Sequence, residues 1–96
     1  MKSLHIRPEA ELDILEAAVW YENERTNLGF EFEAELSEIY RRIVENPRQF
    51  PIQRRDLRRA VFTRFPYAVY FREIDDAIVV AGVFHHHRSP DVSERR

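Results

Sequence analysis

Three consecutive histidines stand near the end of the chain, in the stretch GVFHHHRSPD. Imidazole titrates near neutral pH, so these side chains suit proton transfer, metal binding or a switchable positive charge. Alternate residues of a strand share a face, which places His85 and His87 with Ala81 and Val83 and leaves His86 on the other face. A zinc site needs three or four ligands, commonly including cysteine or a carboxylate. The pattern therefore favours a polar strand end or an acid–base group, and we expect no bound metal.

Arginines precede and follow the histidines in the expected sheet. Guanidinium groups hold carboxylates and phosphates with two parallel hydrogen bonds. A His or Tyr beside them can move a proton while Arg stabilises developing charge, as phosphodiester cleavage requires. The predicted target-binding residues are Arg58, Arg64 and Arg88. The candidate catalytic residues, for the case that the chain is a nuclease, are Arg64, Tyr70, His85, His87 and Arg88.

Several other chemistries have no basis in the sequence. The only two glycines, Gly29 and Gly82, cannot build a phosphate-cradling loop, and no dinucleotide fingerprint occurs, so we expect no cofactor. The chain has no cysteine, which removes disulfides and thiol chemistry. No apolar run approaches the roughly 20 residues that cross a membrane, and the N-terminus lacks a signal-peptide core. We therefore expect a cytoplasmic protein without a membrane partner.

Charge is distributed unevenly along the 96 residues, although the formal net charge is only −2. Residues 1–46 hold 5 basic and 11 acidic side chains, whereas residues 47–96 hold 10 basic and 6 acidic ones. Every basic residue of the second half is arginine. The second half therefore suits an anionic partner, with a solvated rim of charge as the alternative.

The elements that position these residues follow from local patterns. Residues 3–7 alternate polar and apolar as in a short strand. Pro8 suits the first position of a helix, which we extend to residue 25 on an apolar side widened by Leu15, Val19 and Trp20. A turn at TNLG separates it from a second amphipathic helix, which ends before Pro47. Two such helices with a short link form an antiparallel hairpin.

The second half changes to the period of strands. The stretch FPIQRRD is expected to be a loop, followed by three strands in LRRAVFTRF, FPYAVYFREI and AIVVAGVFHHH, with a turn at Asp75 and Asp76. The last strand is apolar on both faces, which is typical of a central strand. The expected fold is a single α+β domain, residues 1–96, of order β-α-α-β-β-β, with the N-terminal helical hairpin packed on a small, mainly antiparallel twisted sheet.

The order of several short motifs resembles the ParE/RelE toxin superfamily, and within it the ParE-like plasmid-stabilisation toxins. In this chain the motifs are an arginine before Phe-Pro-Tyr, a later tyrosine, a strand ending in Val-x-His, and Arg-x-Pro. They correspond to Arg64, Phe65, Pro66, Tyr67, Tyr70, Val83, His85, Arg88 and Pro90. The stretch AELDILEAAVWYENERTNLGFEFEAEL is likewise similar to the family's helical hairpin, so the resemblance covers nearly the whole chain.

The resemblance implies the toxin of a type II toxin–antitoxin system that arrests growth. Its partner would be a small DNA-binding antitoxin, for which we expect an acidic C-terminal segment and a hetero-oligomeric complex. ParE-like members are associated with inhibition of DNA gyrase, and RelE-like members with ribosome-dependent mRNA cleavage. Here the only lysine is Lys2 and the last tyrosine is Tyr70, which is unlike RelE-type nucleases. Gyrase inhibition without catalysis is the first interpretation; an endoribonuclease and a non-toxic antitoxin-binding relative are the alternatives.

Overall fold

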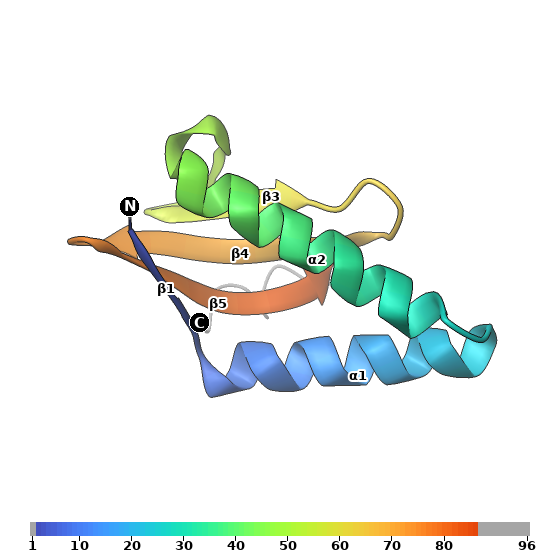
Figure 1. Cartoon of the computed structure of the whole chain (residues 1–96). Helices are drawn as coiled ribbons and strands as arrows, with labels where there is room; N and C mark the ends of the chain where they lie inside the picture. The colour runs from blue at the N-terminus through green and yellow to red at the C-terminus, as the bar shows by residue number, and fades with distance from the viewer. Residues whose placement is uncertain (1, 87–96) are drawn as a thin grey trace.

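Two helices followed by most of a sheet make up the part of the chain, residues 2–86, that the computed structural model describes (Figure 1). Strand β1 (Ser3–Ile6) leads into α1 (Pro8–Glu24), and α2 (Leu28–Glu45) follows after a short link. The remaining elements are η1 (Pro47–Gln49), β2 (Ile52–Arg54), β3 (Leu57–Val61), β4 (Tyr67–Ile74) and β5 (Ala77–His85). The fold class is α+β, as expected, and no helix among these residues is long and apolar enough to cross a membrane.

Local chemistry fixes the ends of the helices. Pro8 is the first residue of α1, where its missing N–H costs no hydrogen bond. Between the helices Asn27 takes a left-handed conformation with φ of 73°, which asparagine tolerates better than most residues. The Glu22 carboxylate accepts the backbone N–H groups of Asn27 and Gly29 at 2.9 and 3.1 Å, and so caps the start of α2. Pro47 follows the last helical turn, as the sequence predicts.

The strands form one sheet in the order β1-β5-β4-β3-β2. β1 runs parallel to β5, and the other neighbours are antiparallel. β5 is therefore a central strand, which explains why its sequence is apolar on both faces. The short edge strand β2 lies in FPIQRRD, which we had expected to be a loop; its three residues are all exposed, so they carry no alternating pattern.

Both helices contribute to the main core on one face of the sheet. Phe32 and Ile43 of α2 and Phe71 and Ile78 of the sheet are completely buried there. In Figure 1, α2 crosses in front of the sheet while α1 lies below it, and the helices diverge from their link. A smaller buried cluster occupies the other face of the sheet and contains Leu57, Ala68, Tyr70, Ala81 and Phe84.

A register shift in the pairing of β4 with β5 changes which residues share a face. Tyr70 pairs with Gly82, but Phe71 pairs with Val80, so Ala81 is an extra residue, as in a β-bulge. Ala81 consequently belongs to the second cluster, whereas Val83 faces the main core. The expectation that Ala81 shares a face with Val83 and His85 is wrong, because strict alternation holds only up to the bulge.

Candidate functional site

The side chain of Arg58 in β3 makes its contacts inside the domain. Its Nη1 donates to the Phe50 carbonyl at 2.7 Å, and its Nε lies 4.0 Å from a Glu73 oxygen. The side chain is only 19% exposed. Arg58 therefore ties the segment before β2 to the sheet, and little of its guanidinium is accessible to a target.

Arg64 is more accessible and lies in the loop after β3, at the other end of that strand from Arg58. Its guanidinium forms an ion pair with Glu31 of α2 and lies over the Phe65 ring, 5.9 Å from the centroid. The hydrogen bond from Arg64 lowers the pKa of Glu31 from its ordinary value. Because 58% of the side chain is exposed, Arg64 can still meet a partner at this loop.

The loop that carries Arg64 is fastened to α2 by Glu35. One oxygen of Glu35 accepts the backbone N–H of Thr63 at 2.6 Å and its hydroxyl at 2.7 Å, and the other accepts the N–H of Arg64 at 3.1 Å. Burial alone would raise the pKa of Glu35, but these hydrogen bonds outweigh it and lower the pKa. The sequence assigned Glu31 and Glu35 no role, since both lie off the apolar stripe of α2.

Tyr70 and His85 cannot share a site. Tyr70 is 6% exposed and belongs to the cluster with Ala81 and Phe84 on the face turned away from the helices. The His85 ring instead contacts the ring of Tyr67, with centroids 5.7 Å apart, and Tyr67 packs on the main core. His86 lies next to His85, with ring centroids 5.8 Å apart. The other two predicted site residues, His87 and Arg88, lie outside the described residues.

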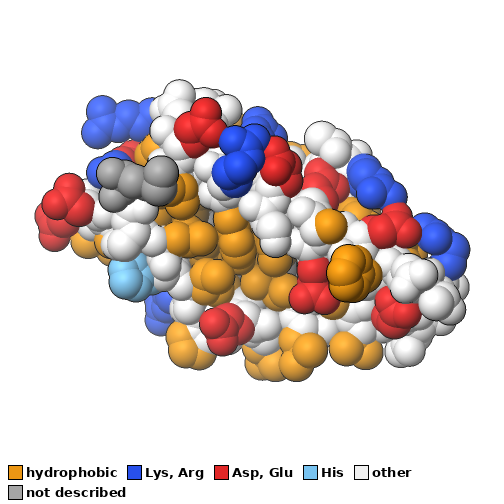
Figure 2. Space-filling model, viewed as in Figure 1, with side chains coloured by type: hydrophobic (Ala, Val, Ile, Leu, Met, Phe, Trp, Pro, Cys, Tyr) orange, Lys and Arg blue, Asp and Glu red, His pale blue; other side chains and the backbone are white. Residues whose placement is uncertain are grey.

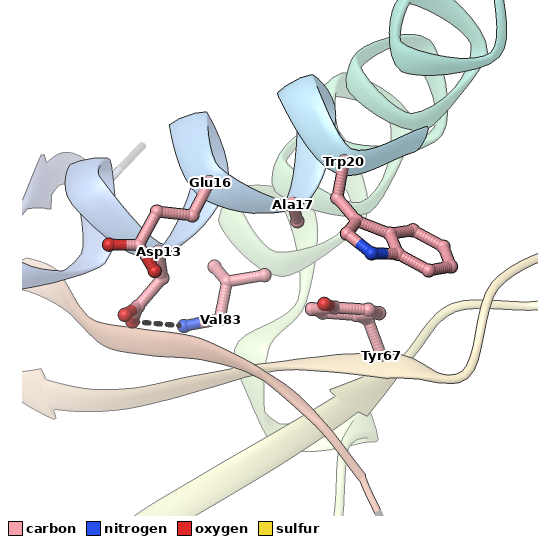
Figure 3. A pocket seen from close by; sticks show the side chains of 6 residues that line it. All are labelled: Asp13, Glu16, Ala17, Trp20, Tyr67 and Val83. Atoms are coloured by element: carbon pink, nitrogen blue, oxygen red, sulfur yellow. Dashed lines mark hydrogen bonds between the residues drawn. The ribbon is translucent and has the colours of Figure 1, made fainter. Parts of the chain in front are cut away.

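A polar cavity opens beside Tyr67, between α1 and the ends of β4 and β5 (Figure 3). Its volume is about 200 Å³. The cavity is lined by Asp13, Glu16, Ala17, Trp20, Tyr67 and Val83. Figure 3 shows two carboxylates on one side of it and two aromatic rings on the other. This environment suits a cationic or hydrogen-bonding group rather than the anionic partner that the arginines indicate.

Asp13 lies in this cavity because β1 covers only the first part of the β5 edge. β1 pairs with β5 only as far as Ile6 opposite Val80, and the Arg7 N–H donates to the Val80 carbonyl. Beyond that point a side chain of α1 takes the place of a strand: Asp13 Oδ2 accepts the Val83 N–H at 3.1 Å. Asp13 is thus a structural acceptor, and sequence reasoning missed it because the contact spans 70 positions.

Among residues 2–86, no three His, Asp or Glu side chains come together in a way that could hold a metal ion. The sites predicted from the sequence are instead spread out. Arg64 lies on the loop beside α2, His85 at the end of β5 on the helix face, and Tyr70 on the opposite face. Within the described part of the chain they form no shared catalytic constellation.

This arrangement, a helical hairpin on one face of a mainly antiparallel sheet, occurs in solved bacterial toxins. The chain superposes on the chromosomal ParDE toxin–antitoxin system from P. aeruginosa with a TM-score of 0.79 and 17% identity, over 88% of this chain and 96% of that one. It also superposes on the isolated E. coli RelE toxin with a TM-score of 0.57 and 17% identity, over 99% and 95% of the two chains. At this identity the likeness shows the fold alone.

Sequence comparison identifies the family. The profile of the ParE toxin of the type II toxin–antitoxin system parDE matches residues 4–90, so the chain belongs to the ParE toxin family. Among curated proteins, no sequence matches it. The family assignment confirms the resemblance that was carried by the Arg-Phe-Pro-Tyr, Val-x-His and Arg-x-Pro motifs.

Proposed function

We propose that this ParE-family toxin arrests growth by binding DNA gyrase in the cytoplasm, without catalysing a reaction, and that a cognate antitoxin neutralises it. The toxin class follows from the family. The observation that favours binding over catalysis is the separation of Tyr70 from His85 on opposite faces of the sheet. A protein that acts by binding needs no such convergence, whereas a nuclease needs its proton-transfer groups within hydrogen-bond reach of one substrate.

The first experiment is induction of the chain in cells with and without the antitoxin encoded beside it. We expect growth arrest without the antitoxin and recovery with it. Purified chain should then inhibit supercoiling by purified gyrase, and equimolar antitoxin should relieve the inhibition. Arrest with gyrase unaffected at high excess of toxin would reject gyrase as the target. Undiminished growth would indicate a non-toxic relative that only binds its partner.

Arg64 is the residue that we propose for target contact, and Arg25 provides its matched control. Both are exposed, at 58% and 60%, and both pair with Glu31. If Arg64 contacts the target, Arg64→Ala should abolish growth arrest while Arg25→Ala preserves it, with the same melting temperature for both variants. Equal effects of the two substitutions would remove Arg64 from the proposed target-binding surface.

Ribosome-dependent mRNA cleavage remains a second candidate because His85, His86 and Tyr67 lie together at the end of β5. Such a group can supply a general acid and a general base. Mapping mRNA 5′ ends after induction separates the two functions: codon-linked cuts that disappear in His85→Gln would favour the nuclease, and their absence favours gyrase.

A further inference from the structure

A hollow of about 500 Å³ lies between α2 and strand β1. It is lined by Leu4 of β1 and by Tyr40, Arg41 and Val44 of α2, among others. Figure 1 places this region at the end of the molecule where the two helices have diverged from their link. In Figure 2, hydrophobic side chains gather in the middle of the same view, below the charged side chains of α2. The hollow is thus separate from both the Arg64 loop and the cavity beside Tyr67.

One polar group in the wall of this hollow lacks a partner. The Tyr40 hydroxyl is buried, and within the described residues it forms no hydrogen bond. Burial, and to a smaller extent the nearby Glu11 carboxylate, raise the pKa of Tyr40. The hydroxyl therefore keeps its proton at neutral pH and remains a donor. A buried donor without an acceptor costs stability, so an acceptor brought to this place gains a hydrogen bond.

The charges at the mouth of the hollow are already paired. Arg41 is 59% exposed, and its Nη1 donates to Glu45 at 2.8 Å while its Nε donates to Glu38 at 3.2 Å. An anionic ligand would have to compete with these two carboxylates for the guanidinium. A cationic ligand would meet the guanidinium itself. The mouth therefore favours a neutral occupant over a charged one.

Water suits the Tyr40 hydroxyl poorly as a partner. A buried water molecule makes about three hydrogen bonds, and the neighbouring lining side chains Leu4 and Val44 are apolar. Small-molecule sites in proteins are typically apolar hollows of roughly 300–1,000 Å³ with a few polar groups that orient the ligand. The size, the apolar lining and the single donor of this hollow agree with that description.

We propose that the hollow between α2 and β1 binds a neutral, apolar small molecule that carries an acceptor, such as a carbonyl oxygen, for the Tyr40 hydroxyl. The site is independent of the proposed action on gyrase and of neutralisation by an antitoxin. A ligand held there contacts both β1 and α2, so its binding stabilises the folded toxin. Failure of this proposal would leave the proposed function intact.

The test uses two probes of the same shape, acetophenone and α-methylstyrene, in which a CH₂ group replaces the carbonyl oxygen. Each is titrated into the purified chain while the methyl signals of Leu4 and Val44 are followed by NMR. Tyr40→Phe should weaken acetophenone binding by about 3- to 10-fold, because one hydrogen bond is lost. It should leave α-methylstyrene within about two-fold. Comparing each probe between the two chains cancels the different hydration of the probes. An equal effect on both probes overturns the role of the hydroxyl.

A third probe, benzoate, tests the charge. It should bind at least about 10-fold more weakly than acetophenone, since a carboxylate loses its hydration in an apolar hollow. Tighter binding of benzoate would assign the site to the Arg41 guanidinium and overturn the neutral class of ligand.

Two tryptophan variants test the location. Ser37→Trp places a large ring at the lining of the hollow and should abolish the shifts caused by both neutral probes, whereas Thr26→Trp, in the link between the helices, should preserve them. Thermal unfolding without probe checks that the variants fold, and Tyr40→Phe should melt at the same temperature as the unchanged chain or higher. A lower melting temperature would mean that the hydroxyl has a partner, such as Glu11, and would overturn the proposal. Absence of shifts at Leu4 and Val44, or shifts that depend on protein concentration alone and so indicate a second copy, would also overturn it.

Discussion

Asp13 shows how one side chain completes a sheet edge. It accepts the Val83 N–H at a point where β1 has ended and no other described strand supplies an acceptor. Asp13→Ala leaves that buried N–H without an acceptor and should lower the free energy of unfolding by about 1–3 kcal/mol. Asp13→Asn keeps a carbonyl oxygen in the same place and should lose less than half as much. Urea denaturation measures both, and equal losses would mean that the negative charge matters rather than the acceptor.

Glu35 makes the stability of the Arg64 loop depend on pH. Its carboxylate accepts hydrogen bonds from Thr63 and Arg64, and its pKa in the folded chain is lower than the ordinary value of 4.5. A depressed pKa means that the unfolded chain takes up the proton first as pH falls. The contribution of Glu35 is therefore complete above about pH 5 and is lost as the pH falls through the folded-state pKa.

Glu35→Gln provides the corresponding test. The variant should be less stable by about 1 kcal/mol at pH 7, since charged acceptors form the stronger hydrogen bonds. The difference from the unchanged chain should shrink as the pH falls below 4.5, because the native carboxylate is then also protonated. Glu33→Gln, on the same helix and exposed, is the control and should change little. A difference that stays constant from pH 7 to pH 3 would show that the carboxylate charge is irrelevant.

At the scale of elements, the crossing of α1 and α2 depends on the absence of a side chain at Gly29. A Cβ at this position would lie 2.4 Å from the Ala18 carbonyl oxygen, which is backbone and cannot rotate away. Alanine is the better helix former by about 1 kcal/mol, yet the clash should dominate and Gly29→Ala should lower stability by about 1–3 kcal/mol. Thermal unfolding of this variant beside Ser37→Ala measures the effect, and a stabilised Gly29→Ala would mean that the helices can separate without loss.

The sequence could predict those elements whose ends carry strong local signals. Pro8 and Pro47 delimit the helices, and the long apolar run of β5 identifies a central strand. It could not predict β2, whose pairing with β3 comes from tertiary contact rather than from its own pattern. The bulge at Ala81 could not be predicted either. One extra residue in β5 hardly changes the composition of the strand, but after it each side chain points to the opposite face of the sheet.

The candidate site was harder to predict than the fold. Arg64 does lie on an accessible loop, but the periodicity of α1 fits two opposite apolar sides, one built from alanines and one from Leu12, Leu15 and Val19. Hydrophobicity alone selects the larger residues as core, so the expectation that Leu15, Val19 and Trp20 widen the packed side of this helix is wrong: all three are exposed. Only the packing against the sheet shows that small residues are needed on the inner side, which leaves the large ones exposed.

At the scale of the whole molecule, ion pairs and hydrogen bonds connect the acidic helical hairpin to the arginine-rich second half of the chain. The ion pair of Arg64 with Glu31 and the hydrogen bonds of Glu35 join α2 to the loop before β4. Arg48 and Arg58 approach Glu73 within the sheet half at 3.5 and 4.0 Å. Much of the opposite charge is thus used internally, and within the described residues Glu11, Glu16 and Glu33 of the two helices form no ion pair.

If the antitoxin contacts the exposed side chains of Leu12, Leu15 and Val19 on α1, its binding and the folding of the whole domain are linked through them. Antitoxin at 100 times its dissociation constant adds about 2.7 kcal/mol of stability, which for a chain of this size raises the melting temperature by roughly 10–20 °C. For Leu15→Ala/Val19→Ala, a 30-fold weaker affinity at the same antitoxin concentration reduces the gain to about 0.9 kcal/mol, or roughly 4–7 °C. Differential scanning fluorimetry at fixed antitoxin concentration measures both shifts, with Ile52→Ala/Ile74→Ala as the control that should keep the full shift. An equal rise for both double variants would mean that the antitoxin stabilises the toxin from another surface.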